Sequence, residues 1–279
     1  MKNLFAIHFA VLLFGGSGIF AKLVDLPAMQ IIFGRTFFAA IFLAIWIFFT
    51  QKNFRPPAKK YFWQFFAAGI ILAAHWITFF WSIQISTVAI GVLTFSTFPI
   101  FTTFLEPLFF REKLKFTDAV SAFFAFAGVA IIVPDFDFSN ATFRGAIFGI
   151  ISGFLFSILA ILNRKLVQKF SSLQISFWEN FFATFALFPI LFFAEIKLQF
   201  EDFLLLILLG TVFTAVAHTF FIKSLEKIRA QTAAIISNLE PVYGILFAIF
   251  LVGEIPNLQT CVGGALILGV VFWRTIFKI

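Results

Sequence analysis

Long apolar runs, each about as long as a bilayer is thick, follow one another along almost the entire chain. A helix needs about 20 predominantly apolar residues to cross a membrane. Ten segments meet this requirement, at 4–21, 29–49, 61–83, 88–110, 116–133, 145–163, 172–194, 203–223, 230–252 and 258–277. They use most of the 279 residues and leave no room for a soluble domain. The sequence therefore predicts an all-α polytopic membrane protein with ten transmembrane helices.

The composition agrees with a chain that folds within lipid. Hydrophobic residues make up 62% of the chain and charged residues 12%, whereas an average soluble domain is about half apolar and a quarter charged. The first run follows Lys2 and has the look of a signal peptide, but residues 6–18 offer no convincing cleavage motif and further spans follow at once. We expect this run to stay as the first span.

Basic residues are distributed unequally between alternate loops. With the amino terminus taken as cytoplasmic, 16 of the 20 Lys and Arg residues fall on the cytoplasmic side. They are Lys2, Lys52, Arg55, Lys59, Lys60, Arg111, Lys113, Lys115, Arg164, Lys165, Lys169, Lys223, Lys227, Arg229, Arg274 and Lys278. This asymmetry follows the positive-inside rule and predicts that both termini are cytoplasmic. The clusters are short and flank helices, so the net charge of +7 indicates topology and not a nucleic-acid site.

Four segments of the first half recur in the same order in the second half. "MQIIFGRTFFAAI" (29–41) resembles "LQISFWENFFATF" (173–185), and "FPIFTTFLEPLFFRE" (98–112) resembles "EPVYGILFAIFLVGE". "KLV" at 22–24 recurs at 165–167, and "FAGVAII" (126–132) resembles "ILGVVFW" (267–273). The separations are nearly constant, at 141 to 144 residues. We therefore predict two copies of a five-span unit, residues 1–137 and 141–279.

An odd number of spans in each copy inserts the two copies into the membrane in opposite orientations. Inverted repeats give two similar halves facing opposite sides, and exchanging their conformations exposes a central site alternately to each side. Two inverted five-helix repeats therefore favour a transporter over a passive scaffold. We expect its cavity to be lined by the first, third, fourth, sixth, eighth and ninth spans.

Several single residues repeat between the halves as well. Each half has a proline in its fourth span with a glutamate thirteen residues later, and a glycine near the end of its fifth span. These residues are Pro99, Glu112 and Gly128, then Pro241, Glu254 and Gly269, and Arg35 lies early in the second span. With this pattern the whole chain resembles the EamA-type branch of the drug/metabolite transporter superfamily. The resemblance implies a carrier of small metabolites, often an amino-acid exporter, and does not specify the substrate.

The stretch "SNLEPVYG" (237–244) places an acid and a proline at the centre of the apolar run 230–252. A carboxylate there is costly, and a proline breaks the helix and frees a backbone carbonyl. Broken helices near the bilayer midplane are how transporters build binding sites. We therefore predict that Glu240 binds substrate or carries a proton, that Asn238 adds polar anchoring, and that Tyr243 forms part of an apolar wall.

The matching stretch of the first half is "FSTFPIFT" (95–102), which keeps the proline but not the acid. Pro99 and Pro241 are therefore predicted to break their helices in both halves. Phe98 occupies the position equivalent to Glu240 and is predicted to be a second apolar wall residue.

Two further pairs of repeat equivalents carry polar or aromatic groups. Arg35 corresponds to Glu179, and Trp76 corresponds to His218. We expect an Arg35–Trp76 cation–π contact toward the outer leaflet and a Glu179–His218 pair toward the inner leaflet, guarding the two mouths. Plain packing between helices is the alternative. Trp76 and His218 are also predicted to contact substrate.

Two other polar residues are expected to be structural. Glu106 lies near the cytoplasmic end of its span, where snorkelling or an ion pair near Arg111 is the expectation. His75 is expected to pack or to face lipid. Gly145, Gly149 and Gly153, four residues apart, predict a helix-packing face.

The sequence predicts a secondary transporter of small amphipathic metabolites across a bacterial cytoplasmic membrane, with amino acids first and efflux favoured over uptake. The alternatives are a nucleotide-derived or sugar-nucleotide substrate, a channel, or an intramembrane enzyme. No metal-ligand spacing, phosphate loop or ATPase motif is present, so no cofactor, metal or catalytic residue is expected. Expected partners are a small molecule and the lipid bilayer, with protons left open and nucleic acid excluded, and the expected state is a monomer or weak homodimer.

Overall fold

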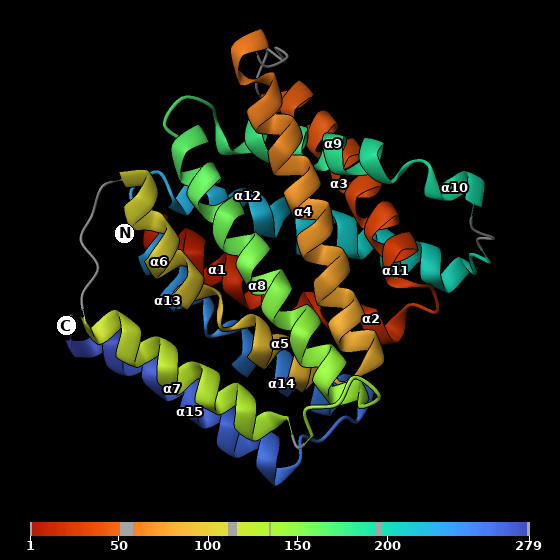
Figure 1. The fold of residues 1–279 in the computed structure, drawn as a ribbon. Coiled ribbons are helices and arrows are strands. Elements are labelled where there is room, and N and C mark those ends of the chain that lie inside the picture. The colour runs from red at the N-terminus through yellow and green to blue at the C-terminus, as the bar shows by residue number, and fades with distance from the viewer. Residues whose placement is uncertain (1, 51–57, 111–115, 134, 194–196, 278–279) are drawn as a thin grey trace.

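The computed structural model describes residues 2–50, 58–110, 116–133, 135–193 and 197–277, and over these ranges it is helical without strands (Figure 1). Its helices in the first half are α1 Lys2–Ser17, α2 Phe20–Leu23, α3 Ala28–Thr50, α4 Lys59–Ile85, α5 Val88–Phe95, α6 Phe98–Phe110 and α7 Phe116–Ile132. Those of the second half are α8 Ala141–Leu166, α9 Ser172–Leu187, α10 Ile190–Phe193, α11 Phe200–Gly210, η1 Thr211–Val216, α12 Ala217–Ser224, α13 Ala230–Ser237, α14 Glu240–Val252 and α15 Leu258–Phe277.

Eight helical segments of the described chain are long and apolar enough to cross a membrane. They are Asn3–Leu23, Ala28–Thr50, Lys59–Ile85, Val88–Phe109, Ala141–Leu166, Ser172–Phe193, Phe200–Ser224 and Ala230–Val252. Each coincides with a predicted span, which confirms a polytopic all-α membrane protein. The other two predicted spans are helices α7 and α15, whose apolar stretches Val120–Ile132 and Leu258–Val270 are shorter. The total of ten therefore stays a prediction.

Two of these segments are interrupted near their middle, each just before a proline. Between α5 and α6 the chain turns at Ser96 and Thr97, and between α13 and α14 it turns at Asn238 and Leu239. The second half-helix then starts with Pro99 or Pro241 in its first turn, where the missing N–H needs no partner. The helix breaks predicted at both prolines are present.

The eighth predicted span contains a different irregularity. Residues Thr211–Val216 form a π-helical segment, η1, between α11 and α12. A π segment adds one residue to the helix and is frequent at functional sites. The Thr214 hydroxyl donates to the carbonyl of Leu209, five residues earlier, at 2.7 Å. This segment was not predicted from the sequence.

Helix α8 packs closely against α4 and α5 through the predicted glycine face. A Cβ atom on Gly149 would lie 1.9 Å from the Thr94 hydroxyl oxygen, and one on Gly145 would lie 2.4 Å from that of Ser86. A Cβ on Gly153 would lie 2.9 Å from the carbonyl oxygen of Phe95. The absence of side chains at these positions lets the helices approach, as predicted.

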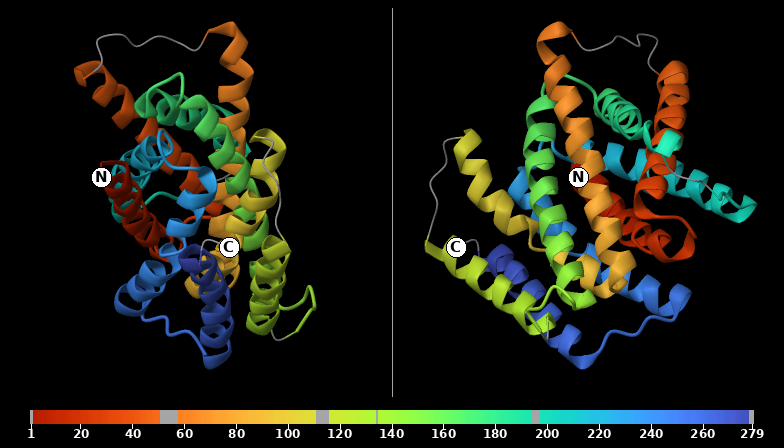
Figure 2. Two further views of the ribbon diagram at one scale, coloured as in Figure 1. Left: turned by 90° about the vertical axis from the view of Figure 1, so that its left-hand side faces the viewer. Right: turned by 45° about the vertical axis from the view of Figure 1, so that its right-hand side comes forward.

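Helices α7 and α15 lie side by side at one edge of the molecule (Figures 1 and 2). A Cβ on Gly263 would lie 2.5 Å from the carbonyl oxygen of Gly128, so the two helices cross closely there. At Gly269, the expected repeat equivalent of Gly128, an added Cβ would meet no atom of the described protein within 4 Å. The central bundle, and not this pair, surrounds the candidate site.

Candidate functional site

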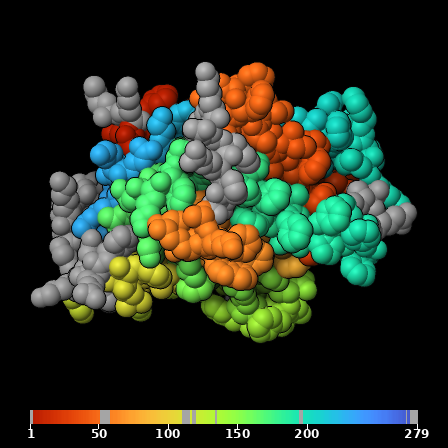
Figure 3. All heavy atoms as spheres, turned by 90° about the horizontal axis from the view of Figure 1, so that it is seen from above, coloured from red at the N-terminus to blue at the C-terminus, as the bar shows by residue number. Residues whose placement is uncertain are grey.

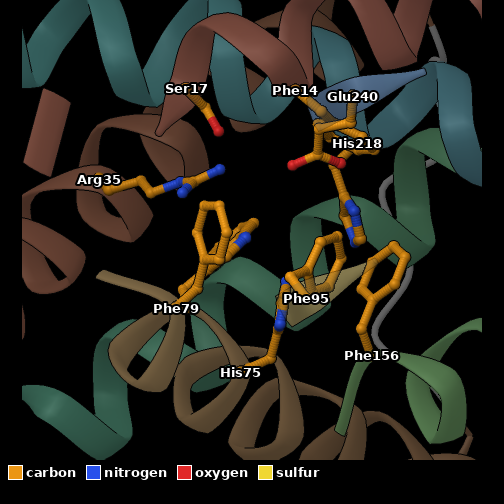
Figure 4. Close-up of a pocket in the computed structure, with 10 residues that line it drawn as sticks. Phe14, Ser17, Arg35, His75, Phe79, Phe95, Phe156, His218 and Glu240 are labelled. Carbon is orange, nitrogen blue, oxygen red and sulfur yellow. The ribbon is translucent and has the colours of Figure 1, made fainter. Parts of the chain in front are cut away.

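A small enclosed cavity lies at the centre of the helix bundle (Figure 4). Its lining residues are Phe14, Ser17, Arg35, His75, Trp76, Phe79, Phe95, Phe156, His218 and Glu240. Every one of them is buried from the outer surface. The centre of a water-sized sphere can move through about 20 Å³ of this cavity, which is room for about one water molecule. The cavity is therefore closed in this conformation.

Helices α1, α3, α4, α5, α8, α12 and α14 contribute the lining side chains. These helices belong to the first, second, third, fourth, sixth, eighth and ninth predicted spans. The sequence predicted all of these spans except the second. The second span also contributes to the lining, through Arg35. Both interrupted spans contribute a lining residue at their break. Phe95 is the last residue of α5, and Glu240 is the first residue of α14.

Arg35 is the cation of the cavity, and its guanidinium is held on two sides. Its central carbon lies 3.8 Å from the centroid of the Trp76 ring, and its Nε donates a hydrogen bond to the Thr214 hydroxyl at 2.7 Å. Thr214 belongs to the π segment, so this irregular turn positions the Arg35 side chain. The predicted cation–π contact between Arg35 and Trp76 is confirmed.

Glu240 enters the cavity from the side opposite Arg35. Figure 4 shows its carboxylate and the Arg35 guanidinium directed toward each other across the open space. No hydrogen bond to the Glu240 carboxylate comes from the described residues. The cavity thus presents one positive and one negative group, 1% and 5% exposed as residues, to anything that enters it.

Aromatic rings fill the wall between these two charges. The Trp76 and His218 ring centroids are 5.9 Å apart, and the Phe95 ring stacks on Phe98 with centroids 5.0 Å apart. Phe156 contacts Phe95 and Phe98 with centroid distances of 5.5 and 5.1 Å. Such a wall suits an apolar or aromatic group held between the charges.

The predicted pair of Glu179 and His218 is also present. The Oε2 atom of Glu179 lies 2.7 Å from Nε2 of His218, and Nδ2 of Asn163 lies 3.5 Å from the same oxygen. His218 lines the cavity, whereas Glu179 lies behind it. Because Trp76 contacts both Arg35 and His218, the two predicted pairs form one continuous cluster. The expectation that they guard two separate mouths is therefore wrong.

Three of the predicted contact residues lie outside the cavity lining. Phe98 forms a second layer behind Phe95. Tyr243 packs its Cβ against Gly15, where an added Cβ would lie 2.5 Å away. Asn238 is fully buried, and neither polar atom of its side chain has a hydrogen-bond partner in the described protein. Their roles in binding stay predictions.

His75 lines the cavity, so the expectation that it faces lipid is wrong, although it does pack tightly. Its Nδ1 atom lies 2.8 Å from the Ser152 hydroxyl on α8, and its ring centroid lies 4.8 Å from that of Phe156. Phe14, Ser17 and Phe79 line the cavity without having been predicted from the sequence. Phe79 lies one helical turn after Trp76 and His75, which is the signal that could have found it.

Buried polar contacts close one end of the cavity region, where the ends of α6 and α8 meet the start of α13. The Glu106 carboxylate pairs with Arg164 and accepts the backbone N–H groups of Ala230 and Gln231 at 3.2 and 3.1 Å. We call this cluster of Glu106, Arg164 and the start of α13 the Glu106 latch. The expected ion pair is present and is made with Arg164. Arg111 lies outside the described residues. In Figure 3 the end of α8 (green) is flanked by the α12–α13 region (blue) and the start of α4 (orange).

A second set of contacts closes the opposite end. The Lys22 ammonium donates to the carbonyl of Ser86 at 3.0 Å. The Gln84 side chain accepts the N–H of Ala28 at 2.9 Å and donates to the carbonyl of Leu26 at 2.8 Å. These bonds join the α2–α3 connection to the end of α4. The cavity thus lies between two polar closures.

A sequence model of the EamA-like transporter family matches residues 1–133 and, separately, residues 143–275. The chain belongs to the EamA-like transporter family.

Individual relatives of this EamA-like protein are also transporters by name. An uncharacterized transporter of Archaeoglobus fulgidus is 28% identical over 96% of this chain and 95% of the relative. The transporter YxxF of Bacillus subtilis is 24% identical over 91% of this chain and 83% of its own length. An S-adenosylmethionine uptake transporter of Rickettsia felis is 22% identical over 87% of this chain and 81% of its own length.

A solved crystal structure shares the fold. It superposes with a TM-score of 0.71 over 99% of this chain and 97% of its own, at 14% sequence identity. At this identity the likeness concerns the fold alone.

Proposed function

We propose that this EamA-like protein is a secondary transporter of small zwitterionic metabolites, with amino acids as the first candidates. One observation carries the proposal. Arg35 and Glu240 face each other across a buried cavity whose remaining wall is mostly aromatic. A zwitterion would place its carboxylate on Arg35, its ammonium on Glu240 and its side chain against the rings. Each charge of the substrate then meets an opposite charge, which a buried site requires.

The second candidate substrate class is nucleotide-derived metabolites. A relative is named for the uptake of S-adenosylmethionine, which joins an amino-acid zwitterion to an aromatic base. Among the lining residues Arg35 is the only Lys or Arg. One cation suits a single carboxylate better than the several phosphates of a sugar nucleotide. We therefore favour zwitterions with or without an attached ring over phosphorylated substrates.

The proposed mechanism is alternating access by two inverted five-helix repeats, residues 1–137 and 141–279, which makes α7 and α15 the fifth and tenth spans. The two separate matches to the family support a duplication. The cavity has room for about one water molecule, so a substrate enters only after the walls move apart. We propose that the two polar closures open in turn. We further propose that the protein lies in the cytoplasmic membrane with both termini cytoplasmic. It would act as an exporter, as a monomer or weak homodimer.

Counterflow in liposomes tests the proposal. Liposomes containing the purified protein would be loaded with one unlabelled compound from a panel of amino acids, S-adenosylmethionine and sugar nucleotides. The uptake of the same compound, labelled and added outside, would then be followed. We expect exchange with zwitterions and none with sugar nucleotides. Glu240→Gln removes a charge-assisted contact, so we expect the apparent affinity for amino acids to fall by at least about tenfold.

Glu201→Gln is the matched control, because Glu201 is an exposed acid in the first turn of α11 and is not among the residues that line the cavity. It should exchange like the wild type. Unchanged exchange in Glu240→Gln would contradict the proposed site. A leak without saturation would indicate a channel, and conversion of the panel compound into another would indicate an enzyme.

A further inference from the structure

Glu179 is a buried acid that the proposed binding of a zwitterion does not use. It belongs to α9, it is 0% exposed, and it does not line the cavity. A lone carboxylate within the hydrocarbon core of a bilayer is costly. Acids in such places are rare and mark ion or proton routes when they are not merely structural. The surroundings of Glu179 distinguish these two roles.

Glu179 and His218 form a pair with one end sealed and one end at the cavity. On the sealed side, Oε1 of Glu179 has no hydrogen-bond partner in the described protein, and Oε2 meets Nε2 of His218 at 2.7 Å. On the open side, the His218 ring lines the cavity, and no described residue bonds its Nδ1. Water in the opened cavity could therefore reach the pair through the imidazole.

A structural pair would satisfy both carboxylate oxygens, as the Glu106 latch does with an arginine and two backbone N–H groups. In the Glu179 pair, Oε2 meets His218 and, at 3.5 Å, the amide of Asn163, while Oε1 is left unbonded in the described protein. Histidine is the residue whose charge changes most readily near neutral pH. This contrast points to a site for a proton.

The charge of the pair depends on one proton. With one shared proton the pair is neutral, whether the proton sits on the carboxylate or on the imidazole. Without that proton it carries one negative charge. While the pair is buried away from water, the neutral form is favoured, because an uncompensated buried charge is costly. Release requires water to solvate the charge, which happens only when the cavity opens to one side.

The other charged and titratable groups around the pair do not take over this role. Arg35 reaches His218 only across the Trp76 ring, and it faces Glu240, so these two charges compensate each other. His75 bonds a hydroxyl and a carbonyl of Ser152 and not a carboxylate. A zwitterionic substrate adds no net charge. The proposed binding of a zwitterion uses the charges of Arg35 and Glu240, which leaves the Glu179–His218 pair as the carboxylate–imidazole pair available for a proton.

We propose that Glu179 and His218 are the proton-binding site that couples substrate movement to a proton gradient. The pair takes one proton from the water on one side of the membrane through His218, keeps it while the cavity is closed, and gives it to the water on the other side. This inference rests on the proposed transport function. It assigns substrate binding to Arg35 and Glu240 and proton binding to the pair behind them.

The test separates exchange from accumulation in proteoliposomes. Wild-type protein should accumulate the amino acid when a pH gradient is imposed and should perform counterflow at equal pH on both sides. Glu179→Gln keeps the size of the side chain but cannot bind the proton. We expect it to lose gradient-driven accumulation and to retain counterflow, while Glu201→Gln retains both. His218→Gln and the double variant should lose accumulation to the same extent, because the pair acts as one unit.

A second readout does not depend on the substrate. Infrared difference spectra of the wild type across a pH titration should contain either the C=O stretch of a protonated Glu179 carboxyl or the ring bands of a protonated His218. These bands should be absent in Glu179→Gln. If no amino acid exchanges in the wild type, the proposed substrate fails, while the infrared titration still decides the proton site.

Three outcomes would overturn the proposal. The first is a wild type that exchanges substrate but ignores a pH gradient. The second is a Glu179→Gln protein that still accumulates substrate under the gradient. The third is a Glu179→Gln protein that melts at the wild-type temperature but loses both counterflow and accumulation. This result would place Glu179 in the binding machinery.

Discussion

Arg35 illustrates how much geometry a single buried side chain needs. The central carbon of the guanidinium lies 3.8 Å from the Trp76 ring centroid, and Nε donates a hydrogen bond to Thr214. A lysine ammonium cannot reproduce both contacts, since it is a compact point charge without a planar face. Arg35→Lys should therefore weaken amino-acid binding by at least about tenfold, as measured by the concentration dependence of counterflow. Arg144→Lys, at an exposed position on α8, is the control and should leave binding unchanged.

At the residue scale the sequence predicted charged and aromatic partners better than it predicted their location. Repeat equivalence matched Arg35 with Glu179 and Trp76 with His218, and the expected depth of each residue then paired Arg35 with Trp76 and Glu179 with His218. It placed the two pairs at separate mouths, because depth along a helix says nothing about how helices tilt toward each other. His75 was expected to pack or face lipid for a related reason. One sequence shows the angle between neighbouring side chains but not which face of the helix meets the bundle.

Helix α8 shows what a close crossing demands of a sequence. A side chain at Gly149 would collide with Thr94 on α5, where a Cβ would lie 1.9 Å from the hydroxyl oxygen. Gly149→Val should therefore destabilise the protein by about 1–3 kcal/mol and lower its melting temperature in detergent. Gly269→Val on α15 provides the comparison, since a Cβ added at Gly269 would meet no described atom within 4 Å. Equal melting temperatures for the two variants would refute this account of the packing.

The Glu106 latch joins the second half of one broken span to the start of the other. Glu106→Gln removes the charge of an acid that holds Arg164 and two backbone N–H groups of α13. We expect this end to open more often, because the variant loses about 1.5–3 kcal/mol of charge-assisted bonding. The measurement uses a protein in which Cys261 is replaced by serine and the lining residue Ser17 by cysteine.

A water-soluble maleimide added from the latch side should then modify the Ser17→Cys position faster in Glu106→Gln than in its parent. The exposed acid Glu201, changed to glutamine, serves again as the comparison. An unchanged rate, or a faster rate only from the opposite side, would mean that the latch does not control entry.

At the element scale the helix breaks were predictable and the π segment was not. Pro99 and Pro241 lack an N–H, so each marks an interruption that can be read directly from the sequence. Nothing comparable marks Thr211–Val216, where no proline occurs and the extra residue is accommodated by packing against α3 and α1.

The molecule as a whole makes a prediction about sidedness. If α7 crosses the membrane, Ser139 lies after five spans, on the side opposite the amino terminus. An alkaline phosphatase fused after Ser139 should then be active in a bacterial host, and a fluorescent protein fused at the carboxyl terminus should fluoresce in the cytoplasm. Crossing by the eight longer segments alone would put Ser139 after four spans. An inactive phosphatase fusion would therefore exclude the proposed inverted repeat.

The π segment has a mechanical consequence for the whole bundle. It holds one residue more than an α-helical turn, and an α-helix advances by about 100° for each residue. If the segment relaxed to an α-helix, the following helix α12 would rotate by roughly that angle relative to α11. His218, at the second position of α12, would swing away from Glu179, and Thr214 would release Arg35 in the same movement. The rearrangement of one turn would thus release the proposed proton-binding pair and Arg35, the proposed partner of the substrate carboxylate, at the same time.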